Sequence, residues 1–138
     1  MRNSPIKVII DTNLWISFLI SKNYKQLDEI ILERNCTLVF SEELMDEFLS
    51  VIKRPKLRKF FTQEDTEGLI ETIEDFANFF KIISKVEACR DVKDNFLLSL
   101  AKDSNANFLI TGDNDLLELD FFEKTRIITI TDFLKSFE

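Results

Sequence analysis

The chain has 138 residues, of which 45% are apolar, and this size and composition fit one domain with a single hydrophobic core. Its 18 basic and 25 acidic side chains give a formal charge of −7, which argues against a protein that coats nucleic acid by overall charge attraction. There is no histidine, and Cys36 and Cys89 lie far apart in the sequence, which excludes zinc fingers, C-x-x-C redox motifs and Ser-His-Asp or Cys-His nucleophiles. No apolar run approaches the roughly 20 residues of a membrane span, so we expect a cytoplasmic protein with free thiols.

Strand and helix patterns alternate along the chain. In chain order, strands are predicted near 6–11, 37–40, 81–84, 107–111 and 126–130. Helices are predicted at about 12–20, 25–34, 42–53, 64–80, 94–104, 113–118 and 131–137. This order favours a three-layer α/β/α fold, a single domain over 1–138 with a mostly parallel sheet of about five strands. Most of the 14 phenylalanines are then expected to fill the helix–sheet interfaces.

Acidic residues directly follow two of the predicted strands. Asp11 comes after an apolar run that ends at Ile10, and Asp113 and Asp115 come after Thr111-Gly112. In an open α/β sheet, ligands bind beyond the carboxyl ends of the strands, so acids at this position on two strands indicate a metal site. Taken alone, each acid could equally cap the helix that follows it, which is a common role of Asp.

Two further acidic positions lie on predicted helices. Glu47 borders the apolar stripe of the helix at 42–53, where an acid is costly to bury unless a cationic group meets it. Asp94, with Asp91 three residues before it, precedes an apolar helix start, where capping and the helix dipole favour an acid whatever the function. The residues by themselves leave a solvated or capping role open for each.

Four segments together resemble the PIN domain, a family of metal-dependent ribonucleases, and most closely the single-domain form that acts as the toxin component of toxin–antitoxin pairs. They are Val8 to Ser17 around Asp11, Ser41 with Glu47 and Arg54-Pro55-Lys56, Arg90 to Ala101 around Asp94, and Leu109 to Leu117 around Asp113. The resemblance covers essentially the whole chain, with the segments in the order of the family. One departure is Asn95, where relatives often have a second acid.

The resemblance implies a metal-dependent endoribonuclease that hydrolyses phosphodiester bonds of RNA and leaves a 5′-phosphate and a 3′-hydroxyl. The implied catalytic residues and metal ligands are Asp11, Glu47, Asp94 and Asp113, with Asp115 as a further ligand. Carboxylate oxygens without His or Cys favour Mg²⁺ or Mn²⁺. Residues that would support the ligands or face the substrate, each of which could also be an ordinary cap or turn residue, are Asn13, Ser17, Ser41, Thr111 and Asp91. The implied partners are an RNA substrate and an antitoxin protein, a homodimer is left open, and no membrane is involved.

Five cations lie within seven residues just after the helix that carries Glu47. They are Lys53, Arg54, Lys56, Arg58 and Lys59. We interpret them as a rim that contacts RNA phosphates. The alternative is a solvated helix end, where cations are favoured by the helix dipole.

Two other functions stay open. A receiver-type phosphoacceptor signalling module also carries acids at strand ends, but it needs paired acids after the first strand and a Lys after the fifth. Here Thr12-Asn13 follows Asp11, and Thr131-Asp132 follows the last predicted strand. The other alternative is a non-catalytic PIN-like scaffold, against which the retention of the four acids speaks.

Overall fold

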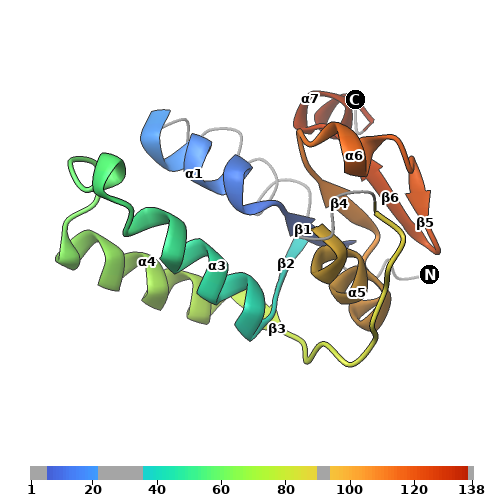
Figure 1. Cartoon of the computed structure of the whole chain (residues 1–138), viewed down its shortest axis with the longest axis horizontal. Helices are drawn as coiled ribbons and strands as arrows, with labels where there is room; N and C mark the ends of the chain where they lie inside the picture. The colour runs from blue at the N-terminus through green and yellow to red at the C-terminus, as the bar shows by residue number, and fades with distance from the viewer. Residues whose placement is uncertain (1–5, 22–35, 90–93, 137–138) are drawn as a thin grey trace.

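The computed structural model describes residues 6–21, 36–89 and 94–136 (Figure 1). The helix expected at 25–34 and the candidate residue Asp91 lie outside the described residues. The strands are β1 (Ile6–Ile10), β2 (Cys36–Phe40), β3 (Ala77–Phe79), β4 (Phe108–Ile110), β5 (Phe121–Phe122) and β6 (Thr125–Ile128). The helices are α1 (Thr12–Ser21), α3 (Glu42–Ile52), α4 (Gln63–Phe76), α5 (Asn95–Ser104), α6 (Asn114–Leu117) and α7 (Ile130–Lys135), with a 3₁₀ turn, η2, at Pro55–Leu57. In the described part of the chain, no helix combines the length and the apolar character that crossing a membrane requires.

The six strands form one sheet in the order β3-β2-β1-β4-β6-β5. Neighbouring strands pair in parallel, except that β5 and β6 are antiparallel. The α/β fold with a mostly parallel sheet is therefore confirmed. The sheet has six strands rather than about five because β5, only two residues long, is too short to produce a strand pattern in the sequence.

The chain between α4 and α5 differs from the prediction. The helix predicted over 64–80 ends at Phe76, and the strand predicted at 81–84 is replaced by β3, which pairs with Leu38–Phe40. Apolar residues continue at helical spacing beyond residue 76, which is why the sequence favours a longer helix. The free edge of β2 offers the backbone of 77–79 a ladder of hydrogen bonds, and this pairing overrides the helical pattern.

A polar stripe on α5 holds the segment that precedes it. Side chains at three positions four residues apart accept backbone N–H groups from that segment. The pairs are Asn95 with Cys89 (2.8 Å), Ser99 with Val86 (3.0 Å), and Asp103 with Ile83 (2.6 Å) and Ser84 (2.8 Å). Asn95, the departure from the family pattern, therefore holds the backbone at Cys89, five residues before the candidate ligand Asp94.

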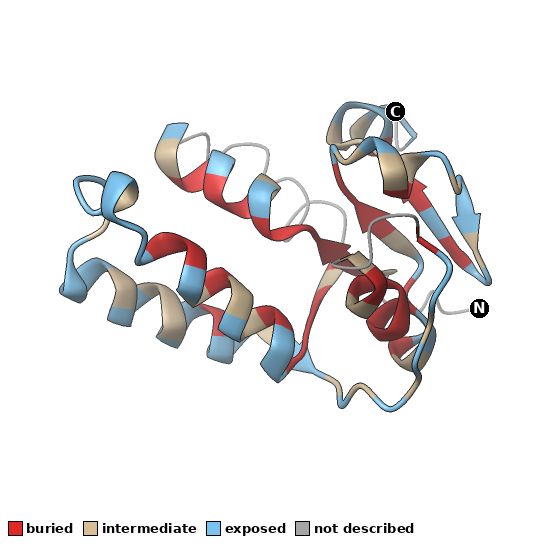
Figure 2. Ribbon diagram, in the orientation of Figure 1, coloured by how far each residue is buried: buried red, intermediate tan, exposed pale blue. Residues whose placement is uncertain are grey.

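The core lies where the helices pack against the central strands (Figure 2). The expectation for the phenylalanines holds for Phe18, Phe40, Phe48 and Phe133, which are buried. It is wrong for Phe60, Phe76, Phe79 and Phe121, which are between 43% and 62% exposed. The first three of these lie on or beside the pair of helices α3 and α4, away from the centre of the sheet.

The connections reverse direction at the centre of the sheet. From β1 the chain moves outward to β2 and β3, and it then crosses over to β4 and β6 on the other side of β1. Right-handed crossovers that move along the sheet in opposite directions place their helices on opposite faces of the sheet. In the view of Figure 1, β2 accordingly runs between α3 and α5. The carboxyl ends of β1 and β4 thus border the crevice in which α/β folds of this kind bind ligands.

Candidate functional site

Asp11 lies at this crevice, directly after β1. Its backbone N–H donates to the carbonyl of Ile110 (3.0 Å), which continues the ladder between β1 and β4 and ties Asp11 to the end of β4. Its side chain is 8% exposed, and Oδ2 accepts a hydrogen bond from the hydroxyl of Thr111 (2.7 Å). The backbone carbonyl of Asp11 accepts the N–H groups of Leu14 (3.0 Å) and Trp15 (3.1 Å), so Asp11 also stands at the start of α1.

The environment of Asp11 raises the pKa of its carboxyl above 3.8, chiefly through burial, which disfavours the charged form. The hydrogen bond from Thr111 and those from the backbone of Asn13 and Thr12 act in the opposite direction. The negative charge of Asp113 raises the pKa further. A buried acid next to a second acid is an arrangement that a bound cation would relieve.

Asp113 meets Asp11 from the end of β4. Its backbone N–H donates to the hydroxyl of Thr111 (3.0 Å), the same hydroxyl that donates to Asp11. Its side chain caps α6 by accepting the N–H of Asp115 (2.8 Å). Asp113 and Asp115 are both half-buried, and the charge of Asp113 is near enough to Asp11 to raise the pKa of Asp11.

Glu47 is joined to this site by a residue that the sequence did not single out. The hydroxyl of Thr12, which is 2% exposed, donates to Oε2 of Glu47 (2.5 Å) and links α1 to α3. Glu47 is half-buried rather than a freely solvated helix side chain. A threonine 35 residues away in the sequence carries no periodic signal, and only its place beside Asp11 in the first motif could have drawn attention to it.

The last predicted ligand is Asp94, at the start of α5. Asp94 occupies the N-cap position of α5 without a side-chain capping bond, and it is half-buried. Within residues 6–21, 36–89 and 94–136, no group of three or more Asp, Glu or Cys side chains is arranged to hold a metal ion. The structure thus brings together Asp11 and Asp113, reaches Glu47 through Thr12, and forms no closed ligand set with Asp94.

A hollow of about 330 Å³ opens beside the two central acids. It is lined by Asp11, Asn13, Leu14, Ser17, Gly112 and Asp113. Asn13 and Ser17 are exposed at its rim, where they can meet a ligand. Ser41 is fully buried and accepts the N–H of Leu44 (3.0 Å), so it performs the alternative role of capping α3.

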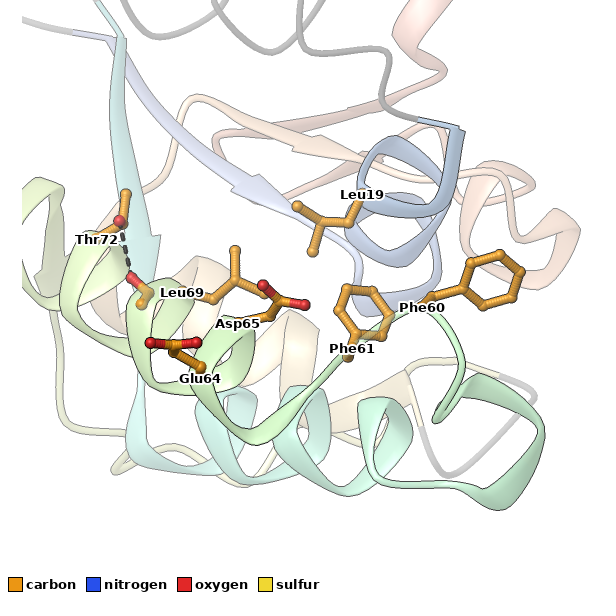
Figure 3. A pocket seen from close by; sticks show the side chains of 8 residues that line it. Leu19, Phe60, Phe61, Glu64, Asp65, Leu69 and Thr72 are labelled. Carbon is orange, nitrogen blue, oxygen red and sulfur yellow. Dashed lines mark hydrogen bonds between the residues drawn. The ribbon is translucent and has the colours of Figure 1, made fainter.

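A larger hollow of about 590 Å³ lies between the end of α1 and α4 (Figure 3). Leu19 faces Phe61 across it, and Glu64 and Asp65 are on the α4 side. Since α1 runs for 10 residues, or about 15 Å, this hollow is a helix length away from Asp11. The candidate site is therefore identified by the two acids beside the smaller hollow, and not by the size of the hollow.

The five predicted RNA-binding cations are all exposed, at the end of α3 and around η2. Phe60, which follows them directly, lines the hollow beside Leu19 at the far end of α1. A contact between these cations and RNA would thus occur about a helix length from Asp11, a distance that a few nucleotides can span.

Known proteins resemble this chain over most of its length. The PIN domain family model matches residues 7–115. An uncharacterized protein of Methanocaldococcus jannaschii is 35% identical over 125 residues, which cover 86% of this chain and 78% of that protein. Among solved structures, the chain is similar to one in the crystal structure described as "VapBC2 from Rickettsia felis bound to a DNA fragment from their promoter". The TM-score is 0.56 at 15% sequence identity, and the match covers 88% of this chain and 97% of the other. At this identity the structural likeness shows the fold alone.

Proposed function

The chain belongs to the PIN domain family, and we propose that it is a Mg²⁺- or Mn²⁺-dependent endoribonuclease, the cytoplasmic toxin component of a toxin–antitoxin pair. The observation that carries the proposal is the meeting of Asp11 and Asp113 at one hollow, at the carboxyl ends of the two central strands. The two acids interact closely enough for the charge of one to raise the pKa of the other.

The residues at this hollow fit a divalent metal ion. The side chains that line or support it offer carboxylate, hydroxyl and amide oxygens and no nitrogen or sulfur of His or Cys, which suits Mg²⁺ or Mn²⁺. Mg²⁺ commonly keeps several waters and uses one or two protein carboxylates, so a pair of acids is a sufficient anchor. We assign Asp11 and Asp113 as the central ligands, with Glu47, Asp94 and Asp115 as further ligands, direct or through water.

The chain's own residues would prepare this site. Thr111 directs one oxygen of Asp11 by donating to it, and Thr12 directs Glu47 in the same way. Each acid is therefore oriented before a ligand arrives. A metal ion bound here would lower the pKa of a bound water and stabilise negative charge on a phosphodiester.

The substrate and partners follow from the same proposal. Asn13 and Ser17, at the rim of the hollow, would contact RNA near the scissile phosphate. Lys53, Arg54, Lys56, Arg58 and Lys59 would contact phosphates further along the strand. We take an antitoxin protein as the partner that restrains the activity, and a homodimer as the form in which the chain exists.

The decisive experiment compares Asp11→Asn with Asp75→Asn, a change at an exposed acid on α4. Asp11→Asn is expected to abolish Mn²⁺-dependent cleavage of single-stranded RNA while the circular dichroism spectrum is retained, and Asp75→Asn is expected to cleave like the wild type. Undiminished cleavage by Asp11→Asn would overturn the proposal.

Two measurements separate the alternatives. Absence of Mn²⁺ binding in calorimetry would favour the non-catalytic scaffold. Transfer of a phosphoryl group from a small phosphodonor to Asp11 would favour the receiver-type module.

A further inference from the structure

An exposed aromatic ring lies at the end of the cluster of five cations. Phe60 directly follows Lys59 and is 43% exposed, whereas its neighbour Phe61 packs against the core. In Figure 3 the ring of Phe60 points away from that of Phe61. The carboxylates of Glu64 and Asp65 lie on the other side of Phe61 in the same view. The ring of Phe60 is therefore accessible from the solvent, on the side away from these two acids.

The backbone around Phe60 is held in place before any ligand binds. Its N–H donates to the carbonyl of Leu57 (3.0 Å), which closes a turn after η2. Leu57 and Phe61, on either side of it, pack against the core. Thr62 then caps α4 by accepting the N–H of Asp65 (3.0 Å). Because the turn is already formed, a ligand that contacts the ring has little backbone entropy to remove.

The cations beside Phe60 are free to meet an anion. Residues 53–62 contain five cations and no acid, and none of the five forms an ion pair with a described residue. Glu67 lines the same hollow as Lys53 and Arg58. It is exposed, and its side chain accepts a hydrogen bond from the amide of Gln63 (3.4 Å) on the same helix. One acid beside five cations leaves this segment positive, although the whole chain has a formal charge of −7.

Lys59 connects the ring to the charges. Its Nζ lies 5.2 Å from the centre of the Phe60 ring, so one nucleotide can place its phosphate on Lys59 and its base on Phe60. The ring keeps its 43% exposure with Lys59 in this position, which leaves room for a base. A single exposed Phe is common on protein surfaces. An exposed ring within a run of cations, however, is typical of proteins that bind single-stranded nucleic acid.

We propose that Phe60 is a stacking platform for one base of a single-stranded RNA whose phosphates contact the neighbouring cations. The inference rests on the proposed function, because it assigns a contact to the proposed RNA substrate. Bases in a duplex are already stacked on each other, so the platform selects a strand with an unpaired base at this position.

The position of Phe60 separates its role from the chemistry. It lies beside the end of α1, about 15 Å from Asp11. At about 3.4 Å for each stacked nucleotide, the base on Phe60 is about four or five nucleotides from the cleaved bond. Phe60 is thus a positioning residue for the strand and does not touch the reacting atoms.

The test measures binding of the whole chain to a fluorescein-labelled single-stranded RNA of about ten nucleotides, by anisotropy in EDTA so that no cleavage occurs. Phe60→Leu keeps an apolar side chain and removes the π face, and it is expected to bind about tenfold more weakly. Phe60→Trp keeps the π face, and it is expected to bind at least as tightly as the wild type. The slope of affinity against salt should be equal in the three proteins, because no phosphate contact is changed.

Phe121→Leu is the matched control. Phe121 is 54% exposed, and the guanidinium of Arg126 lies 5.4 Å from the centre of its ring, so it is also an exposed ring beside a cation. It belongs to β5, the edge strand opposite β3, and it has no cluster of cations around it in the sequence. Phe121→Leu is therefore expected to bind RNA like the wild type.

Two further readouts are specific to stacking. RNA should quench the tryptophan fluorescence of Phe60→Trp, whereas the wild type, whose single Trp15 is 5% exposed, should show no change. In the Mn²⁺-dependent cleavage assay, Phe60→Leu should raise KM about tenfold with little change in kcat, because the lost contact is remote from the reacting atoms.

The inference is overturned if Phe60→Leu binds the RNA like the wild type, if RNA leaves the fluorescence of Phe60→Trp unchanged, or if the wild type does not bind the RNA. The first result would leave Phe60 to a protein partner, and the proposed nuclease would still stand if Asp11→Asn abolished cleavage. Conversely, RNA binding that depends on Phe60 without any metal-dependent cleavage would retain the platform and refute the nuclease.

Discussion

Thr12→Val tests whether the link between α1 and α3 prepares the site. Valine keeps the shape of a side chain that is 2% exposed and removes only the hydroxyl that donates to Glu47. A hydrogen bond to a charged group contributes about 1.5–3 kcal/mol, and because Glu47 is half-buried, water replaces part of it. We therefore expect the free energy of unfolding to fall by about 1.5 kcal/mol, measured by urea titration without metal.

The same variant is expected to bind Mn²⁺ about tenfold more weakly in calorimetry, because hydrogen bonds that orient a ligand affect affinity by this amount. Thr125→Val is the matched control: Thr125 is also 2% exposed, and its hydroxyl donates to the carbonyl of Ala106 (2.7 Å), outside the site. It is expected to lose about 1 kcal/mol of stability without a change in Mn²⁺ affinity. If Thr12→Val loses stability but binds Mn²⁺ like the wild type, then Thr12 is a structural link only.

Two further predictions concern acids whose pKa values shift in opposite directions. Because the folded pKa of Asp11 is raised above 3.8, the charged form of Asp11 destabilises the metal-free fold. The free energy of unfolding of the wild type, relative to that of Asp11→Asn, should therefore fall as pH rises through the folded pKa. A pH-independent difference between the two proteins in urea titrations would contradict this. Burial acts to raise the pKa of Asp103, but hydrogen bonds from Ser84 and Ile83 outweigh it and lower the pKa. Asp103→Ala should therefore cost about 1–2 kcal/mol near neutral pH and speed hydrogen exchange at the amides of Ile83 and Ser84. The cost should become smaller as pH falls through the lowered pKa, because protonation removes the charge-dependent part of these hydrogen bonds. Unchanged exchange would show that the contact is not stabilising.

The strands that carry the site were predictable because each combines two strong signals. An apolar run buried on both faces ends at an acid, and Asp11 and Asp113 follow the ends of β1 and β4 as the pattern indicates. The helix boundary at residue 76 was not predictable, because the competing interaction is a backbone ladder with β2, and such pairing leaves no mark on the local apolar spacing.

In the site, too, the features set by local sequence were predictable and those set by long-range packing were not. The predicted acids Asp11 and Asp113 are next to their own strands, so chain order alone places them. The hydrogen bond from Thr12 to Glu47 depends on how α1 packs on α3, which no local pattern encodes. The polar stripe of Asn95, Ser99 and Asp103 on a largely buried helix did carry a signal, since polar side chains at four-residue steps on such a helix need partners.

The two threonines hold the acids in a crossed arrangement. Thr12 follows Asp11 in the chain but donates to Glu47, whereas Thr111 comes shortly before Asp113 but donates its hydroxyl hydrogen to Asp11. Glu47 and Asp11 are thus each held by a threonine from another part of the fold, so the site forms only when β1, β4 and α3 have packed together. The hydroxyl of Thr111 offsets part of the burial and repulsion at Asp11, yet the pKa of Asp11 stays raised. A proton and a metal ion therefore compete for the same carboxylate. Metal affinity should therefore fall as pH drops through that raised pKa, in parallel with the gain in stability of the metal-free fold.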